Sequence, residues 1–447
     1  MQIKRLLTFV TSMVVGISLF SSSLAVFAAD TNWIKNNSNE IKSLTSEDYS
    51  DLEFLKPILK GKTVVALGEN FHRVAEYSST KARLIKYLHE KLGFDVIAFE
   101  SGLGECSAVY EDSRSLSSKE MMENSIFPIW HSKETLDLFN YIKQQNKTNN
   151  PLYLTGYDMQ PTTLYFTQFL SNWISKVNKA YAKEYYSFEM QYFKDYYSII
   201  NKYGEDSYKH MDELNQVKSK YDPQYKKVIQ FIDNNKEKLA DVYPNSPHII
   251  DIAQKALSDR MKFIEMTMYD TRSSYEFRDK IMTENVEWIM KILYPGKKVI
   301  LWAHNDHLAK STSKMLVKEN GKWINSFTSM GELLNQKFKE KEYVLGFYMN
   351  RGKASTITTQ KNFNIAPMPK GSLENLIMKS GYKNTFIDLS TQQTENKGNS
   401  WMFNPIFAAE DGMTEEIIKP MSMLFVPKDQ YDGLIVIDKV NEPTINY

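Results

Sequence analysis

Hydrophobic and polar residues follow two alternating patterns along most of the chain. Short apolar runs that are typical of buried strands are separated by segments such as 79–92, in which apolar residues recur at helical spacing. Near-continuous apolar strands separated by helices predict an α/β fold, with a mostly parallel sheet covered by helices on both faces. We expect residues 30–160 and 295–447 to form this core. The predicted strands are residues 63–67, 94–99, 152–155, 298–302, 343–347, 385–389 and 434–437.

Residues 161–294 have a different pattern and predict an all-helical insertion into the core. Gly204 is the only glycine between Gly156 and Gly296. Tyrosines recur in this stretch at helical spacing, and we interpret them as residues that pack between helices. If the insertion overhangs the carboxyl edge of the sheet, it would act as a lid over a substrate pocket. Breaks between its helices are predicted near Pro223, Pro244 and Pro247.

The N-terminus resembles a secretory signal peptide. Two basic residues precede an apolar run at 6–27, which ends in small residues. Serine and threonine interrupt the run and no stop-transfer charges follow it, so cleavage is favoured over an uncleaved anchor. We therefore expect residues 1–28 to be the signal peptide, with cleavage after Ala28 or Ala29. The mature protein is predicted to be secreted, with no stable membrane span.

Composition narrows the function further. The chain has 55 Lys and Arg against 54 Asp and Glu, a net charge of +1, so it has no basic excess with which to bind nucleic acid. Its single cysteine, Cys106, excludes an intrachain disulfide and a cysteine-based zinc site. We interpret Cys106 as a small buried apolar residue.

Ionisable residues follow four of the predicted strands, in the segments 68–72, 100–102, 156–158 and 303–307. The carboxyl ends of parallel strands share one edge of a sheet, where ligands bind. An imidazole oriented by carboxylates is suited to general-base catalysis. The candidates at this edge are Glu69, His72, Glu100, Asp158, His304 and His307, whereas the other four histidines, including His89, are expected to be solvated.

Two observations bear on the type of chemistry. The chain has no Gly-x-Ser-x-Gly segment, so water is favoured over serine as the nucleophile. The same cluster also offers nitrogen and oxygen ligands for zinc or manganese, which keeps a metal-dependent hydrolase open as an alternative. A third possibility is a non-catalytic extracellular binding protein linked to surface polysaccharide. The alternative metal ligands are Glu69, His72, Glu100, His304 and His307.

The chain contains an ordered set of short motifs that spans about residues 55–440. The motifs are Ala66–His72 with Glu76, Gly93–Glu100, Gly156–Gln160, Arg278–Asp279 with Met282 and Asn285, Trp302–His307, and Ser329–Gly331. This set resembles the erythromycin esterase family. The resemblance implies an α/β core with a helical insertion, and hydrolysis of a carboxylic ester without an obligatory metal or other cofactor. The wider superfamily includes metal-dependent proteases and haem-binding proteins.

The resemblance also implies roles for individual residues. His72 would activate water, assisted by Glu69 and Glu100, while His304 and His307 would bind the substrate or the developing oxyanion. Two positions depart from the family pattern and bear on the substrate. Arg73 replaces a glycine and Lys81 replaces an arginine.

The residues expected to bind substrate are Arg73, Glu76, Lys81, Asp158 and His307. Members that inactivate macrolides work inside the cell, whereas this chain carries an export signal. The expected partner is therefore a small-molecule ester, a lactone or an acylated surface glycan.

Overall fold

The computed structural model describes residues 31–319, 321–410 and 416–446. The predicted signal peptide at 1–28, with its cleavage at Ala28 or Ala29, lies outside these residues. The described part of the chain contains a nine-stranded sheet and a four-stranded sheet. The larger sheet consists of β1 (Ser38–Glu40), β2 (Val64–Leu67), β3 (Phe94–Gly102), β4 (Tyr153–Asp158), β5 (Lys298–Trp302), β8 (Glu342–Ser355), β9 (Asn362–Ile365), β10 (Asn384–Asp388) and β13 (Gly433–Val440).

The larger sheet has the strand order β1-β10-β13-β8-β2-β5-β3-β4, with β9 paired to β8. Every neighbouring pair from β13 through to β4 is parallel, whereas β1, β9 and β10 pair with their neighbours in antiparallel fashion. The predicted α/β fold with a mostly parallel sheet is therefore confirmed. All seven strands expected from the apolar runs are present.

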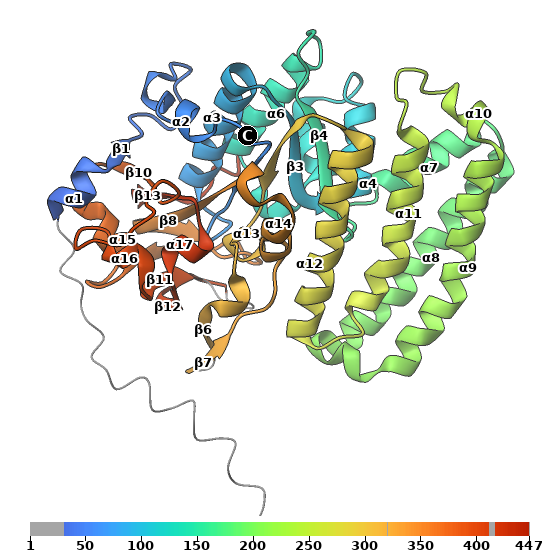
Figure 1. Ribbon diagram of the computed structural model, residues 1–447. Helices are drawn as coiled ribbons and strands as arrows, with labels where there is room; N and C mark the ends of the chain where they lie inside the picture. The colour runs from blue at the N-terminus through green and yellow to red at the C-terminus, as the bar shows by residue number, and fades with distance from the viewer. Residues whose placement is uncertain (1–30, 320, 411–415, 447) are drawn as a thin grey trace, which may run out of the picture.

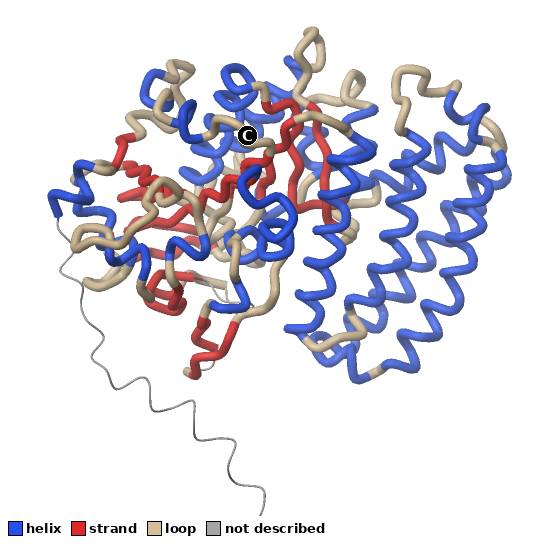
Figure 2. The backbone as a smooth tube through the Cα atoms, viewed as in Figure 1, coloured by secondary structure: helices blue, strands red, loops and turns tan. Residues whose placement is uncertain are grey.

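Helices cover both faces of this sheet (Figure 2). On one face, Val65 and Ile97 belong to a core that includes residues of α3 and α6, and on the other, Val64 and Val96 pack with residues of α12 and α14. Alternate residues of each strand thus enter different cores, which explains why the strands are apolar throughout. The helices of the α/β core are α1 (Thr31–Asn36), α2 (Leu55–Ile58), α3 (Ala75–Leu92), α4 (Leu103–Glu111), α5 (Ser118–Ser125), α6 (Lys133–Gln145), α13 (Asn305–Leu308), α14 (Met330–Phe338), α15 (Leu373–Ile377), α16 (Ser400–Phe403) and α17 (Pro427–Gln430).

The segment between β4 and β5 is helical apart from its connections. Figure 1 shows α7 to α11 as a bundle beside the β4 edge of the sheet, with α12 between the bundle and the core. The bundle has its own hydrophobic core, which also includes Leu103 and Ala108 of α4. Its helices are α7 (Tyr165–Ser175), α8 (Lys179–Tyr203), α9 (Met211–Asn234), α10 (Lys236–Ala240) and α11 (Ile249–Met266), followed by α12 (Thr271–Trp288) and the short helices η3 (Gly204–Lys209) and η4 (Ile289–Leu293).

The predicted break at Pro223 is wrong, because α9 continues through this residue. Val217, Tyr221 and Tyr225 are buried on one side of α9 on both sides of the proline. Burial of this apolar face offsets the hydrogen bond that proline cannot donate. Pro244 and Pro247 do lie in the connection between α10 and α11, as predicted.

Two further observations concern a second sheet and the possibility of a membrane-spanning helix. The second sheet has the order β11-β12-β6-β7, and the sequence patterns did not predict it. No helix in the described ranges is both long enough and apolar enough to cross a membrane. The strands of the second sheet are β6 (Leu316–Glu319), β7 (Lys322–Asn325), β11 (Ile406–Glu410) and β12 (Lys419–Phe425).

Two side chains test expectations about burial. Cys106 is buried as predicted, and burial raises the pKa of its thiol, with Glu105 adding to the effect. The expectation that His89 is solvated is wrong. His89 is buried where α3 packs against α6, and its Nδ1 lies 2.6 Å from the hydroxyl of Tyr141.

Candidate active site

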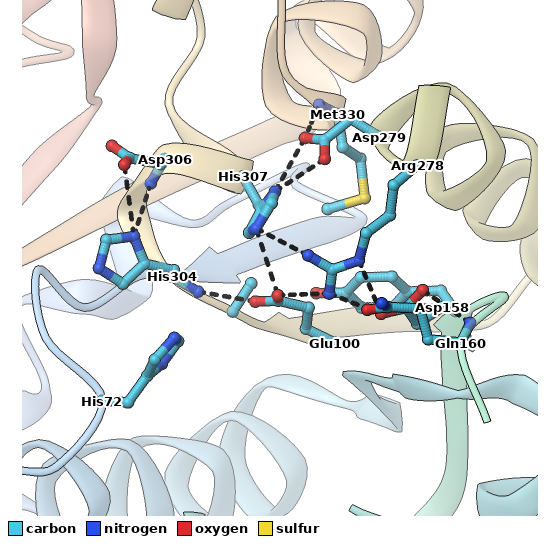
Figure 3. A network of polar contacts seen from close by, with 12 residues as sticks. His72, Glu100, Asp158, Gln160, Arg278, Asp279, His304, Asp306, His307 and Met330 are labelled. Carbon is cyan, nitrogen blue, oxygen red and sulfur yellow. Dashed lines mark hydrogen bonds and ion pairs between the residues drawn. The ribbon is translucent and has the colours of Figure 1, made fainter. Parts of the chain in front are cut away.

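Four adjacent strands place their carboxyl ends at one edge of the sheet, and most of the predicted residues meet there. β2, β5, β3 and β4 are neighbours. They lead into Glu69, His304, Glu100 and Asp158 respectively, and all four residues are buried. The parallel register thus brings segments separated by up to 235 residues in the sequence into one cluster (Figure 3).

Glu69 and His72 form the first carboxylate–imidazole pair of this cluster. Nδ1 of His72 lies 2.8 Å from Oε1 of Glu69, and the same oxygen accepts a 2.6 Å hydrogen bond from Nε1 of Trp130 in η2 (Pro128–Trp130). Lys81 on α3 donates to Oε2 of Glu69 at 2.6 Å. Glu69 is buried, whereas the side chain of His72 keeps 15% of its surface exposed. The carboxylate is therefore fixed, and the imidazole is partly exposed to solvent.

Burial and neighbouring charges set the ionisation of this pair. Burial raises the pKa of Glu69, but the Lys81 ammonium and His72 outweigh burial, and the net pKa is lowered. Burial lowers the pKa of His72, although Glu69 opposes this effect, so the imidazole is neutral near pH 7. Burial also lowers the pKa of Lys81 to about 8, even though Glu69 favours its charged form.

Arg278 of α12 joins the ends of β3 and β4. Its Nη2 donates to Glu100 Oε1 at 2.8 Å and to Asp158 Oδ2 at 2.6 Å, and its Nε also donates to Asp158 at 3.0 Å. Asp158 accepts a further hydrogen bond from the backbone N–H of Gln160. Burial raises the pKa of Glu100, but His307 and Arg278 outweigh it and bring the pKa to about 2.

His307 and Asp279 form a second carboxylate–imidazole pair. Nδ1 of His307 lies 2.8 and 2.9 Å from the two oxygens of Asp279, and Asp279 also accepts a hydrogen bond from the backbone N–H of Met330. Nε2 of His307 lies 3.3 Å from Oε1 of Glu100. Burial lowers the pKa of His307, but the carboxylates of Asp279 and Glu100 outweigh burial and raise it. The surroundings therefore shift the pKa values of His307 and His72 in opposite directions.

His304 lies between the other two histidines (Figure 3). Its ring centroid is 5.0 Å from that of His72, and its backbone N–H donates to Glu100 Oε2 at 3.1 Å. The backbone N–H of Asp306 donates to Nδ1 of His304, which assigns the ring proton to Nε2. Nε2 in turn lies 3.2 Å from Oε1 of Glu410, at the end of β11.

Arg73 and Glu76, which were expected to bind substrate, are not brought into this cluster. The buried guanidinium of Arg73 donates to Ser355 and to the backbone carbonyls of Pro128 and Ile129, which precede Trp130. Glu76 instead accepts hydrogen bonds from the backbone and side chain of Asn441. Both side chains are therefore engaged by other segments of the protein.

Several residues of the cluster were not among the sequence candidates. Arg278 and Asp279 occur in a motif that supports the family resemblance, so that motif was a usable signal. Trp130 and Glu410 had no such signal, because each comes from a short segment whose position depends on tertiary packing.

One group of side chains has the geometry of a metal site. In the parts of the chain that the structure describes, ligand atoms of His304, Asp306 and Glu410 all lie within 4.8 Å of one another. This group shares only His304 with the five metal ligands considered from the sequence. The donor set of one imidazole and two carboxylates suits zinc or manganese.

Comparison with known proteins identifies the family. The sequence model of the erythromycin esterase family matches residues 89–440. This chain belongs to the erythromycin esterase family. The predicted membership is thereby confirmed, and the family is one of hydrolases. The matched residues include Glu100, His304 and His307, whereas Glu69 and His72 precede the match.

Three relatives show how closely the chain follows other members of the family. It is 32% identical over 433 residues to the "Putative hydrolase YbfO" of Bacillus subtilis strain 168, covering 93% of this chain and 92% of the relative. It is 25% identical to the type I erythromycin esterase of Escherichia coli, over 59% of this chain and 66% of that protein. The type II enzyme of Escherichia coli is 22% identical, over 79% of this chain and 87% of that enzyme.

Solved structures share the fold. A protein of Bacillus cereus superimposes with a TM-score of 0.71 at 20% identity, covering 93% of this chain and 98% of that chain. A succinoglycan biosynthesis protein gives a TM-score of 0.68 at 18% identity, with the same coverage of both chains. A mutant of the erythromycin esterase EreC in its open conformation gives 0.57 at 18% identity, over 92% of this chain and 99% of that chain. At these identities the likeness concerns the fold alone.

Proposed function

We propose that this protein is an exported hydrolase that cleaves a carboxylic ester or lactone with a water molecule activated by His72. The observation that carries this proposal is the Glu69–His72 pair at the carboxyl edge of the sheet. A buried carboxylate holds one nitrogen of an imidazole that is neutral near pH 7 and partly open to solvent. This is the arrangement that a general base requires.

The hydrogen bonds of His72 define the direction of proton transfer. The charged carboxylate of Glu69 can only accept, so Nδ1 of His72 carries the ring proton and Nε2 has the free lone pair. Nε2 takes a proton from water, and the resulting hydroxide oxygen attacks the carbonyl carbon. When the tetrahedral intermediate collapses, the imidazolium returns the proton to the departing alkoxide. The overall reaction adds one water across the ester bond.

The remaining residues of the cluster have supporting roles in this proposal. Glu69 stabilises the imidazolium that forms on His72, while Trp130 and Lys81 keep the carboxylate in place. We assign stabilisation of the developing oxyanion to His304, whose ring faces His72. Arg278 and His307 hold Glu100 in place. Glu100 positions His304 through the backbone N–H of that residue and pairs with Arg278.

The proposed substrates are small esters, lactones or acylated glycans. The type I and type II enzymes of Escherichia coli are named for erythromycin, a macrolide lactone, and one structural neighbour is named for succinoglycan biosynthesis. The signal peptide predicted at residues 1–28 favours a substrate outside the cell. We propose that no metal or other cofactor takes part and that nucleic acid is not a partner.

Mass spectrometry of candidate substrates tests the proposal. The mature protein, starting after Ala29, is incubated with erythromycin and with a panel of simple esters, lactones and acetylated glycans. We expect a product heavier by one water from a lactone, or the separated acid and alcohol from an ester, with no loss of rate in the presence of a chelator. His72→Ala should abolish turnover. His248, a partly exposed histidine just before α11, provides the control, and His248→Ala should leave turnover unchanged. Equal turnover by His72→Ala and the unaltered protein would refute the mechanism.

A metal-dependent hydrolase is the second candidate, favoured by the grouping of His304, Asp306 and Glu410. Elemental analysis of the purified protein and titration with Zn²⁺ or Mn²⁺ distinguish it from the first. Stoichiometric metal together with activity that a chelator removes and the metal restores would support this candidate. Full activity in metal-free protein would exclude it.

A further inference from the structure

Two short segments of the chain meet at the Glu69 carboxylate. The first joins β2 to α3 and carries Glu69 and His72, and the second leads into α6 and carries Trp130. Nε1 of Trp130 donates to Oε1 of Glu69 at 2.6 Å, and the same oxygen lies 2.8 Å from Nδ1 of His72. The rings of His72 and Trp130 are perpendicular, with centroids 5.3 Å apart. The position of Glu69 therefore depends on how these two segments are held against each other.

Arg73, in the first segment, joins the two segments inside the protein. Its side chain is buried, and its Nη1 donates to the backbone carbonyls of Pro128 at 3.4 Å and Ile129 at 3.3 Å. These two residues directly precede Trp130. Nε of Arg73 donates to the hydroxyl of Ser355, at the end of β8, at 3.1 Å. The guanidinium therefore holds the backbone that carries Trp130 next to the segment that carries Glu69.

Residues 441–444, which we call the strap, follow β13 and join the same two segments at the surface. At α3, the carbonyl of Asn441 accepts a 3.0 Å hydrogen bond from the N–H of Ala75, the first residue of the helix. The backbone and side-chain N–H groups of Asn441 each donate to Glu76, the second residue of the helix, at 2.7 Å. The first N–H groups of a helix have no partner within it, so the strap satisfies one of them.

The strap repeats this pattern at α6. The carbonyl of Thr444 accepts a 2.8 Å hydrogen bond from the N–H of Lys133, the first residue of α6. The N–H of Thr444 donates to Glu134, the second residue of α6, at 3.2 Å. The two helices begin three residues after His72 and three residues after Trp130 respectively. The strap thus fixes the distance between the two helix starts that follow these residues.

We propose that Arg73 and the strap position Trp130 so that its indole N–H fixes the carboxylate of Glu69 beside His72. They are positioning residues, because they act on Glu69 through Trp130. The inference rests on the proposed esterase function, since it assigns positioning residues to that reaction. It also gives Arg73 a role that glycine, the residue of the family pattern at this position, could not take, because glycine has no side chain to donate to the carbonyls before Trp130.

Hydrogen exchange of the Trp130 indole N–H measures the bond to Glu69 without any substrate. The mature protein is labelled with ¹⁵N in its tryptophans, and the NMR signal of Trp130 is identified by its absence in Trp130→Phe. The indole of Trp173, which donates to the backbone of Leu239 in the helical bundle at 2.9 Å, is the internal reference. Exchange that accelerates equally at Trp130 and Trp173 in a variant would indicate general loosening of the protein and would overturn the proposal.

Variants of Arg73 test the buried contact. Arg73→Met should accelerate exchange at Trp130 at least about tenfold, the effect of losing one hydrogen bond to a charged group. Arg73→Lys keeps a donor for the two carbonyls and should restore part of the protection. Ser355→Ala, a milder change that removes only the hydroxyl next to Nε, should also accelerate exchange. Exchange at the unaltered rate in both Arg73→Met and Ser355→Ala would overturn the role of Arg73.

A double variant tests the strap. Glu76→Ala/Glu134→Ala removes both carboxylates that accept from the strap and should accelerate exchange at Trp130 about threefold, less than Arg73→Met because these contacts are near the surface. Glu237→Ala is the matched control, because Glu237 is an exposed glutamate at the second residue of α10. This control should exchange at the unaltered rate. Equal rates in the double variant and the control would overturn the role of the strap.

Kinetics test whether Arg73 acts through Trp130. Trp130→Phe and Arg73→Met should each lower kcat for the best ester about tenfold with little change in KM, because the general base is misplaced while substrate contacts remain. The double variant should be no slower than Trp130→Phe alone. Losses that multiply would overturn the proposal. If no protein hydrolyses any ester, the proposed function fails, whereas the exchange rates still decide whether Arg73 and the strap position Trp130.

Discussion

Nδ1 of His72 and Oε1 of Glu69 are 2.8 Å apart, and Glu69 accepts two further hydrogen bonds, from Trp130 and Lys81. Glu69 therefore has donors on both carboxylate oxygens and is buried, whereas His72 is partly exposed. This asymmetry makes His72 the group that meets substrate and Glu69 the group that positions it. The tryptophan and the lysine limit the movement of the carboxylate in turn.

Glu69→Gln should lower kcat for the best ester by about 10²- to 10⁴-fold, the usual contribution of an oriented general base. The amide cannot stabilise the imidazolium of His72, and it leaves the buried ammonium of Lys81 without its counter-ion. Steady-state kinetics with folded variant, verified by circular dichroism, measures the effect. Glu47→Gln, at an exposed glutamate, serves as the matched control. A loss smaller than threefold would contradict the role of Glu69.

The pH profile of kcat/KM should have a limb on each side of neutrality. On the acid side, activity is lost as His72 becomes protonated, and burial places this pKa below the usual value for histidine. On the alkaline side, Lys81 loses its proton with a pKa of about 8 and no longer compensates the charge of Glu69. We therefore expect maximal activity between these two values, with a decline above about pH 8.

Lys81→Arg should move the alkaline limb to higher pH, because a guanidinium keeps its charge throughout the accessible range. The acid limb should move little, because His72 keeps the same carboxylate partner. Profiles of kcat/KM for both proteins between pH 5 and 10 make the comparison. If the alkaline limb lies at the same pH in both proteins, a group other than Lys81 causes it.

The sequence predicted the sheet, and it predicted that ionisable residues would follow its strands, for a physical reason. The parallel strands are buried on both faces, so they are apolar throughout, and the ionisable residues that follow them are conspicuous. Parallel strands end at the same edge of a sheet, and because the structure makes β2, β5, β3 and β4 neighbours, Glu69, His304, Glu100 and Asp158 converge. The strand order itself could not be predicted from the apolar runs.

The remaining site residues depend on packing that no local pattern encodes. Trp130 reaches Glu69 from a short helix, and the buried Arg73 holds the backbone just before it. Glu410 comes from a second sheet whose short strands were not expected. Arg73 looked like a substrate residue because it follows His72 in the sequence, but its side chain contacts protein carbonyls.

Arg260→Met should destabilise the protein by about 3–5 kcal/mol, the cost of leaving buried carboxylates unpaired. Arg260 on α11 donates to Glu105 of α4 at 2.6 Å and to Glu189 of α8 at 3.0 Å, and all three side chains are buried. This triad links the helical bundle to the core. Urea unfolding monitored by fluorescence measures the free energy of unfolding.

Two comparisons show whether unpaired charge causes that loss. Arg272→Met, at an arginine whose side chain is 48% exposed, should change stability little. Adding Glu105→Gln and Glu189→Gln to Arg260→Met should restore much of the stability, because no buried charge then lacks a partner. If the triple variant is as unstable as Arg260→Met, the loss in the free energy of unfolding comes from lost packing and not from unpaired charge.

Glu342, at the start of β8, is a buried carboxyl group with no hydrogen-bond partner on either oxygen among the described residues. Burial raises its pKa to about 8, and the nearby charge of Asp432 adds to the effect. In the unfolded chain the pKa of glutamate is about 4.3. The folded state therefore binds this proton more tightly than the unfolded chain does. The stabilisation that the bound proton gives to the folded state is complete below about pH 4 and is lost as the pH rises towards 8.

Glu342→Gln should remove this pH dependence, because the amide stays neutral at every pH. Between about pH 4.3 and 8, Glu342 lowers the free energy of unfolding by up to about 1.4 kcal/mol per pH unit, so the variant should gain stability over the unaltered protein as the pH rises. Thermal unfolding of both proteins at pH 5, 6, 7 and 8 measures the difference. Glu340→Gln, at an exposed glutamate two residues away, should follow the unaltered protein at each pH. Parallel curves for Glu342→Gln and the unaltered protein would mean that Glu342 is already ionised in the folded state.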